Sequence, residues 1–472
     1  MTLRELSSLE QYFYYRCKLK LHSCFYLAIT LNKLPNRNQL QNSIIKTIRK
    51  FPQAHCTVTT VTKGQTPCIK DLTGTAIHFD DVVEYPTWKS LTTENINEIF
   101  KNYSFEFDNG KPLWKIIVLE ETNQLIFVVS HIFFDGMSST IFANSVIDQL
   151  NDEANTSIDL DNDIVYESTK DIDELPPHPY DLWPITFSWK LKRQLVKLLL
   201  KVSPSLVTGT STDILQFEKY NFPDDFIRVP SDENDTFIVQ NDNIQKLLNI
   251  KPDKLQKILN KCKEEKSSLT SFLSAMFAIG LKNVYADNLR NGKALTISIP
   301  MNARSICKEV LNIDESSLQL GDIILGMEYS DNLDSIDSTD LWTLSAKIKD
   351  YMVDYRENQI SNQINTAKLL DIADVESFVR QKVENAYGIG PGAAFEITNL
   401  GFNKFGNDTN ENNEFIVTDA FFNQPQGFSN IFTCSIISTP IGGLNCCISY
   451  PKNLIAEMEP IWKTVEDIID KI

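Results

Sequence analysis

The chain has 472 residues, of which 42% are hydrophobic and 23% are charged, and its formal net charge is -17. This length and composition predict a globular protein with more than one domain and exclude a disordered or fibrous chain. The acidic balance argues against a nucleic-acid partner, because contacts to a phosphate backbone need a basic surface.

Nine cysteines are scattered along the chain without any C-x-x-C spacing. This usage is typical of buried thiols in a reducing compartment and argues against a disulfide framework or a zinc site. The first residues, MTLRELSSLEQ, place charges where a signal peptide needs its apolar segment. No run of about 18 apolar residues occurs, so no segment is expected to span a membrane. We therefore expect a cytoplasmic protein.

The first 150 residues alternate between helical and strand patterns. Ser7 and Glu10 form a capping-box pattern ahead of a short, unusually aromatic helix. The hydrophobic periodicity predicts further helices over 38–50 and 92–103, and strands over 21–31, 56–61, 68–72 and 114–119. The last of these strands is expected to form a hairpin with the apolar run 125–129.

The middle of the chain changes composition twice. Residues 151–174 are rich in acids and read as a solvated connection. The segment 184–204, PITFSWKLKRQLVKLLLKVSP, then carries five basic residues and no acidic one among its apolar residues. One interpretation is an amphipathic helix on a membrane surface or at the mouth of an apolar channel. The other, which we favour on sequence alone, is a helix packed on the protein's own acidic surface.

The second half repeats the mixture of helices and strands. Helices are expected over 241–248, 252–263, 269–285, 341–355, 365–387 and 454–472, and strands over 294–299, 323–329, 394–399, 415–422, 431–438 and 443–450. The resulting prediction is a mixed α/β protein with an N-terminal lobe over 1–207, a crossover over 208–235 and a C-terminal lobe over 236–472.

The stretch most suggestive of chemistry is QLIFVVSHIFFDGMSSTIFA at 124–143. His131 should lie at the end of a buried strand, where a tight turn that contains Asp135 and Gly136 begins. A helix should then begin at Met137 or Ser138. An imidazole can accept a proton near neutral pH, and glycine suits a sharp reversal where a side chain would clash. The alternative is a core histidine beside an N-capping aspartate, and residue types alone leave the two interpretations equal.

Several separated motifs add a family resemblance. HIFFDG resembles the H-x-x-x-D-G signature of the acetyl-CoA-dependent acyltransferases that share the chloramphenicol-acetyltransferase and condensation-domain fold. The chain is most similar to their fungal alcohol acetyltransferase branch, in SSLEQYFYYR, SIPMNARS, ITNLGFN, QPQGFSNIF and GGLNCCISYPKN, in that order. Its aromatic N-terminus and LHSCFY are also similar to yeast members that acetylate the amine of sphingoid-base analogues. The D-F-G-W-G motif of plant members is absent, and QPQGF occupies the comparable loop.

The resemblance implies two similar α/β lobes, each a mixed sheet flanked by helices, with a tunnel between them in which His131 acts as general base. Asp135 would be structural and would pair with Arg304 of the other lobe. The residues expected to stabilise the oxyanion are Thr398, Asn399, Gln424 and Gln426. Ser138 and Ser139 are expected to cap the following helix. The family uses no metal, and no metal-spaced cluster is apparent in the sequence.

The expected reaction moves an acetyl group from acetyl-CoA to the hydroxyl of a small apolar alcohol or to the amine of a long-chain acceptor. The resemblance does not decide between the two. The expected enzyme is a monomer in the cytoplasm, and a peripheral position on the endoplasmic reticulum with membrane contact through 184–204 is the alternative. The alternatives are an inactive acyl-CoA or lipid-binding protein of the same fold and a condensation-type enzyme. The intact His131, Asp135 and Gly136 argue against the first, and the absence of carrier modules argues against the second.

Overall fold

The computed structural model describes residues 2–21, 24–62, 64–102, 105–152, 162–168, 175–202, 215, 227–228, 238–239, 243–285, 294–389, 391–406 and 413–472. The acid-rich segment 151–174 lies largely outside these residues. The expected crossover over 208–235 lies almost wholly outside them, so the division of the chain at 207 and 236 stays a prediction.

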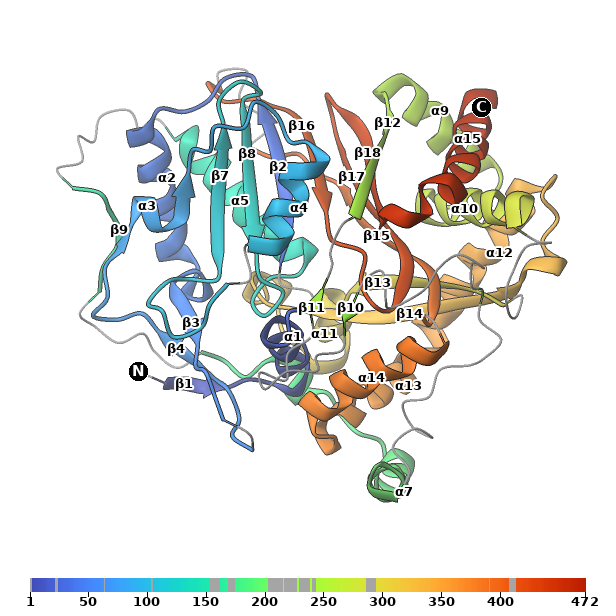
Figure 1. Ribbon diagram of the computed structural model, residues 1–472, viewed down its shortest axis with the longest axis horizontal. Helices are drawn as coiled ribbons and strands as arrows, with labels where there is room; N and C mark the ends of the chain where they lie inside the picture. The colour runs from blue at the N-terminus through green and yellow to red at the C-terminus, as the bar shows by residue number, and fades with distance from the viewer. Residues whose placement is uncertain are drawn as a thin grey trace.

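Two sheets, each covered by helices, form two lobes that lie side by side (Figure 1). The sheet of the first lobe has the strand order β16-β2-β8-β7-β6. The strands of the N-terminal half are β1 (Thr2–Glu5), β2 (Phe25–Leu31), β3 (Cys56–Val58), β4 (Cys68–Asp71), β5 (Ile77–His78), β6 (Val83–Glu84), β7 (Trp114–Leu119), β8 (Gln124–Val129) and β9 (Ile164–Tyr166). The larger helices are α1 (Ser8–Lys18), α2 (Arg37–Lys50), α4 (Thr93–Asn102), α5 (Gly136–Leu150) and α7 (Phe187–Val202).

Strand β8 is buried on both faces, as its apolar run predicts. Leu125, Phe127 and Val129 pack in the large core that includes α2 and α5. Ile126 and Val128 pack in a separate cluster with the apolar face of α4. The strand that leads into His131 is therefore packed against side chains on both of its faces.

The sheet of the second lobe is mixed and has the order β12-β18-β17-β15-β13-β14. Its strands are β12 (Asn243–Ile250), β13 (Ala294–Asn302), β14 (Ile324–Asn332), β15 (Ala393–Phe402), β17 (Asn430–Thr439) and β18 (Gly443–Pro451). Its main helices are α9 (Pro252–Glu264), α10 (Leu269–Tyr285), α11 (Arg304–Leu311), α12 (Leu341–Asp354), α13 (Ile360–Ala367), α14 (Val375–Ile389) and α15 (Ile455–Lys471). Helix α10 is apolar nearly all round because it is buried between this sheet and helices α12 and α15.

The second half of the chain also completes the first lobe. Strand β16 (Val417–Asn423) pairs antiparallel with β2, from Val417 opposite Leu31 to Asn423 opposite Tyr26. Figure 1 shows this strand between the sheets of the two lobes. The exchange ties the lobes together through backbone hydrogen bonds, which are the least sequence-dependent contacts available.

The predicted mixed α/β fold is confirmed, but two of its elements are wrong. Residues 243–250 form the edge strand β12, not a helix, because they pair along their whole length with β18. The expected helix 365–387 is broken: a 3₁₀ turn at Lys368–Ile372 ends α13, and the Asp374 carboxylate accepts from the Ser377 N–H at 2.7 Å to start α14. Local periodicity misleads in both places because pairing and capping decide the backbone.

Candidate active site

The H-x-x-x-D-G segment forms the turn between β8 and α5. The Phe134 N–H donates to the Ser130 carbonyl at 3.1 Å, which closes the turn that carries His131. Asp135 is the N-cap of α5, and its Oδ1 accepts from the Ser138 N–H at 2.7 Å. The helix begins at Gly136, one residue before the earlier of the two predicted starts, Met137 and Ser138. Asp135 therefore does the capping that we expected of the two serines.

His131 lies between two aromatic rings. Its imidazole is stacked on Phe13 with ring centroids 4.8 Å apart, and the Phe25 ring lies 4.5 Å away. Phe13 comes from α1, so the aromatic N-terminal helix forms one wall of the site. The side chain of His131 is 14% exposed.

Burial lowers the pKa of His131 to about 3, because a charged imidazolium is poorly solvated there. The guanidinium of Arg16, one turn along α1 from Phe13, lowers this pKa further, while Asp135 and the Phe134 backbone oppose the shift. His131 is therefore neutral in the resting protein over the whole physiological range. A neutral imidazole is the form that a general base needs.

The Asp135 carboxylate is held by four donors. Arg304, the first residue of α11 in the second lobe, donates to Oδ2 at 2.8 Å and to Oδ1 at 3.1 Å. The Ile323 N–H donates to Oδ2 at 3.0 Å, and the Ser138 N–H occupies Oδ1. Both members of the ion pair are buried. These four donors tie the carboxylate to α5, to α11 and to the backbone before β14.

Ser138 connects the same turn to the loop before β14. Its hydroxyl donates to the Gly321 carbonyl at 2.8 Å and accepts from Arg304 at 2.9 Å. The Asp135 N–H also donates to that carbonyl, at 3.4 Å, and Phe134 forms an isolated bridge with Gly321. Residues 321 and 323 are thus fixed on either side of Asp322.

Asp322 is a site residue that the sequence did not reveal. It is fully buried, and its Oδ1 lies 4.0 Å from Nδ1 of His131. Neither carboxyl oxygen has a hydrogen-bond partner among the residues that the structure describes. Burial raises the pKa of Asp322 well above its usual value; Asp135 and Glu10 add to this, and Arg304 and Arg16 oppose it. No local motif marks this residue, because its proximity to His131 arises from contacts between the lobes.

Strand β15 presents one face to the turn. A Cβ at Gly136 would overlap the Leu400 side chain, so this glycine permits a close approach of the two lobes. Glu396, Thr398 and Leu400 follow one another at intervals of two residues, so their side chains lie on the same face of the strand. Phe395 lies on the other face and packs against Phe277 of α10.

The four oxyanion candidates separate into two groups. The Thr398 hydroxyl donates to Glu396 at 3.2 Å, and the Gln424 amide donates to the same carboxylate. Burial raises the pKa of Glu396, which those two groups and Arg16 oppose. The Asn399 amide instead donates to Thr270 of α10 at 3.0 Å, and the Gln426 amide donates to the Asn430 carbonyl at 2.6 Å and the Gly427 carbonyl at 2.5 Å.

A second cluster of titratable groups lies away from His131. Side-chain atoms of His55, Cys56 and Asp71 come within 4.8 Å of one another in the core of the first lobe. Sequence spacing did not suggest this cluster, because Asp71 reaches the other two through the pairing of β4 with β3. His55 hydrogen-bonds Asp71 at 3.1 Å and stacks on Tyr166, and the Cys56 thiol donates to the Pro52 carbonyl. We interpret the cluster as structural.

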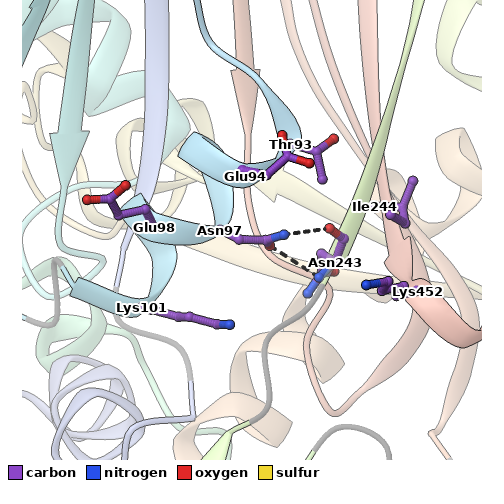
Figure 2. A pocket seen from close by; sticks show the side chains of 8 residues that line it. All are labelled: Thr93, Glu94, Asn97, Glu98, Lys101, Asn243, Ile244 and Lys452. Carbon is purple, nitrogen blue, oxygen red and sulfur yellow. Dashed lines mark hydrogen bonds between the residues drawn. The ribbon is translucent and has the colours of Figure 1, made fainter. Parts of the chain in front are cut away.

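An open pocket of about 440 Å³ lies between the lobes, at α4 and β12 (Figure 2). The Asn97 side chain donates to the Asn243 carbonyl at 2.9 Å and accepts from its N–H at 3.2 Å, which joins the two elements. Asn243 in turn accepts from the Gln426 N–H at 3.1 Å. Most of the residues that line it are polar or charged and His131 is not among them, so we treat this pocket as part of the contact between the lobes.

Comparison with known proteins identifies the family. A family model described as alcohol acetyltransferase matches residues 5–469. The chain belongs to the alcohol acetyltransferase family. This alcohol acetyltransferase family member is 34% identical to the N-acetyltransferase SLI1 of Saccharomyces cerevisiae over 471 residues, which cover 99% of each chain. The protein is accordingly an acyltransferase.

Solved structures agree on the fold of this family member. The trichothecene 15-O-acetyltransferase TRI3 of Fusarium sporotrichioides matches with a TM-score of 0.66 at 11% identity, over 99% of this chain and 94% of that one. TRI101 of the same fungus, in complex with coenzyme A and T-2, matches with a TM-score of 0.57 at 10% identity, over 98% of both chains. An epimerization domain of tyrocidine synthetase matches with a TM-score of 0.59 at 11% identity, over 99% of this chain and 96% of that one. At such identities the likeness shows the two-lobed fold alone.

Within the part of the chain that the structure describes, no helix combines the length and the apolar character needed to cross a bilayer.

Proposed function

We propose that this acyltransferase moves an acetyl group from acetyl-CoA to the hydroxyl or amine of an apolar acceptor, with His131 as general base. The observation that carries the proposal is the position of His131, largely buried between the Phe13 and Phe25 rings on a turn that Arg304 of the other lobe holds through Asp135. The relative named as an N-acetyltransferase supports acetyl transfer, and the TRI101 complex with coenzyme A supports the donor.

In this mechanism both substrates are bound before chemistry begins. His131 takes the proton from the acceptor oxygen or nitrogen as that atom attacks the thioester carbonyl. When the carbon–sulfur bond breaks, the imidazolium returns the proton to the departing thiolate. Proton transfer of this kind contributes about 10² to 10⁴-fold, and holding both substrates together contributes through proximity. No acetyl group is carried by the protein, so radiolabelled acetyl that stayed on denatured enzyme after incubation with acetyl-CoA alone would contradict the scheme.

The developing oxyanion needs hydrogen-bond donors. Thr398, Asn399, Gln424 and Gln426 remain the candidates. Thr398 and Gln424 are the better supported, because both surround Glu396 on the face of β15 that meets the turn. Their donors must turn away from Glu396 when substrate binds. Asn399 is less favoured because its amide points to Thr270 of α10, on the other side of β15. Gln426 is less favoured because its amide donates to the backbone carbonyls of Gly427 and Asn430.

We favour a long-chain amine over a short alcohol as the acceptor. The 34% identical relative is named as an N-acetyltransferase. The aromatic N-terminus and LHSCFY resemble family members that act on sphingoid-base analogues. The Phe13 and Phe25 rings beside His131 give the site an apolar lining that suits a hydrocarbon chain. A small apolar alcohol is the second candidate, since the family model is that of alcohol acetyltransferases. The proposal also includes a monomer that works in the cytoplasm, peripherally on the endoplasmic reticulum.

The test is a thiol-release assay with acetyl-CoA against short alcohols and long-chain amino alcohols. We expect release with the wild-type protein and at least one acceptor, and a loss of about 10² to 10⁴-fold in His131→Ala. His55→Ala is a control for general loss of a buried histidine, because His55 pairs with Asp71 in the core of the first lobe. Release that is the same in His131→Ala as in wild type would disprove the mechanism. Acyl-CoA binding without release toward any acceptor would favour the inactive binding protein.

A further inference from the structure

Helix α7 has two distinct faces. On one face the Trp189 indole donates to Asn362 at 3.0 Å, and Arg193 lies 3.6 Å from Asp371, so this face packs on the second lobe. In Figure 1 the helix lies at the periphery, away from both sheets. These contacts attach one face of the helix to the second lobe.

The opposite face is apolar and open to solvent. Five of its residues are 58–77% exposed, and they are Phe187, Leu191, Leu195, Leu198 and Val202. Their spacing of three or four residues places them in one stripe along the helix. A helix normally buries such a stripe in the protein's core, and a contiguous exposed one indicates an interaction surface.

Charge selects the kind of surface. The helix contains Lys190, Lys192, Arg193, Lys197 and Lys201 and no acidic residue, although the whole chain has a net charge of -17. At about 100° per residue, Lys190 and Lys197 lie on one side of the apolar stripe and Lys192 lies on the other. Lysines that flank an apolar stripe can reach lipid phosphates while the stripe enters the acyl region.

We propose that the exposed face of α7 docks the protein on an anionic lipid bilayer. The packing on the protein's own surface that we favoured on sequence alone is present as well, but it uses the other face of the helix. The helix would lie in the plane of the interface, with the apolar residues at its level and the lysines in the headgroup layer. The binding depends on no step of the proposed reaction. It would bring the site to membrane-borne, long-chain molecules.

The test is flotation of the full-length protein with vesicles of phosphatidylcholine alone or mixed with phosphatidylserine. We expect binding to the anionic vesicles that weakens as salt is raised, because the lysine contribution is screened. Leu191→Ser with Leu198→Ser should lower the partition coefficient about tenfold or more. Lys190→Glu with Lys197→Glu should remove the preference for phosphatidylserine.

Matched controls use residues of similar exposure elsewhere. Leu247→Ser with Ile441→Ser removes two exposed apolar side chains outside α7, and should bind as wild type. Lys257→Glu with Lys263→Glu on α9 repeats the charge change and should retain the lipid preference. Circular dichroism and melting would show that each variant is folded. Failure of wild type to float with anionic vesicles, or equal flotation of Leu191→Ser with Leu198→Ser, would overturn the proposal. Concentration-dependent self-association that this double variant abolishes, without lipid binding, would assign the face to a second copy.

Discussion

The Arg304 guanidinium donates two hydrogen bonds to the Asp135 carboxylate of the opposite lobe, at 2.8 Å and 3.1 Å. Both side chains are buried, and the same carboxylate caps the helix that follows the His131 turn. A buried ion pair is a weak source of net stability, because desolvation offsets the attraction, but its geometry is demanding. The pair therefore links the turn to the second lobe, and we propose that it fixes the position of the turn.

Replacing Asp135 with alanine should reduce the free energy of unfolding by about 3 to 5 kcal/mol, because Arg304 would stay buried without a counter-charge. Urea unfolding would measure the loss, and the rate of acetyl transfer should fall with it. The double variant Asp135→Ala with Arg304→Met should lose less unfolding free energy than the sum of the losses of the two single variants. A soluble, normally melting and inactive Asp135→Ala would instead mean that the carboxylate acts directly in the reaction.

The second prediction concerns pH. Since burial and Arg16 lower the pKa of His131 to about 3, the imidazole should be neutral at every pH between about 4 and 8. Arg16→Met removes a nearby positive charge, so it should raise the pKa of His131. The acid limb of kcat/KM should then move to higher pH. Lys18→Met removes the same charge from the same helix and is the control. An NMR titration of the His131 ring reads the pKa without relying on activity, and an unchanged value in Arg16→Met would contradict the assignment.

The lowered pKa of His131 should also make the free energy of unfolding depend on pH. The unfolded chain binds a proton at His131 below about pH 6.5, whereas the folded chain does so only near pH 3. The free energy of unfolding should therefore decrease as the pH falls through this window, by about 1.4 kcal/mol per pH unit from this group. His131→Gln should flatten that slope.

The third prediction assigns a positioning role to Asp322. A buried carboxyl with no hydrogen-bond partner among the described residues costs stability, so Asp322→Asn should melt at the wild-type temperature or higher. If the carboxyl tightens on Nδ1 of His131 when substrates bind, the same change should lower kcat about 10²-fold and leave both KM values unchanged. A structural role would give the reverse, a lower melting temperature with normal kcat. The control is Asp331→Asn, the same change at an aspartate near the other end of β14.

The sequence predicts what depends on local pattern. Helix α10 was expected over 269–285 and occupies Leu269–Tyr285, because its residues are apolar on nearly every side. The turn at His131 was also expected, since a buried strand followed by Asp-Gly has few conformations available. The pairing of Asp135 with Arg304 came only from the family resemblance, as the two residues lie 169 positions apart.

Residues whose role depends on long-range packing were missed. Arg16 was assigned only to a helix, Glu396 only to a strand, and Asp322 to neither. Each becomes part of the site because α1, β15 and the loop before β14 converge on the turn. Strand β12 was mistaken for a helix for a related reason, since its partner β18 lies about 200 residues further along the chain.

The last prediction concerns the contact between Gly136 and Leu400. Gly136→Ala would place a methyl group where the Leu400 side chain now lies, so Leu400 must move or the lobes must separate. We expect a loss of about 1 to 3 kcal/mol in the free energy of unfolding, as for other overpacked cores, and a lower kcat, because the turn carries His131. In the Leu400→Ala background the added methyl group has space, so its effect should be small or favourable. Gly326→Ala on β14, where no described atom lies within 4 Å of the new methyl group, is the matched control. A Gly136→Ala protein with the stability and kcat of wild type would show that the lobes do not meet at this turn as closely as the structure indicates.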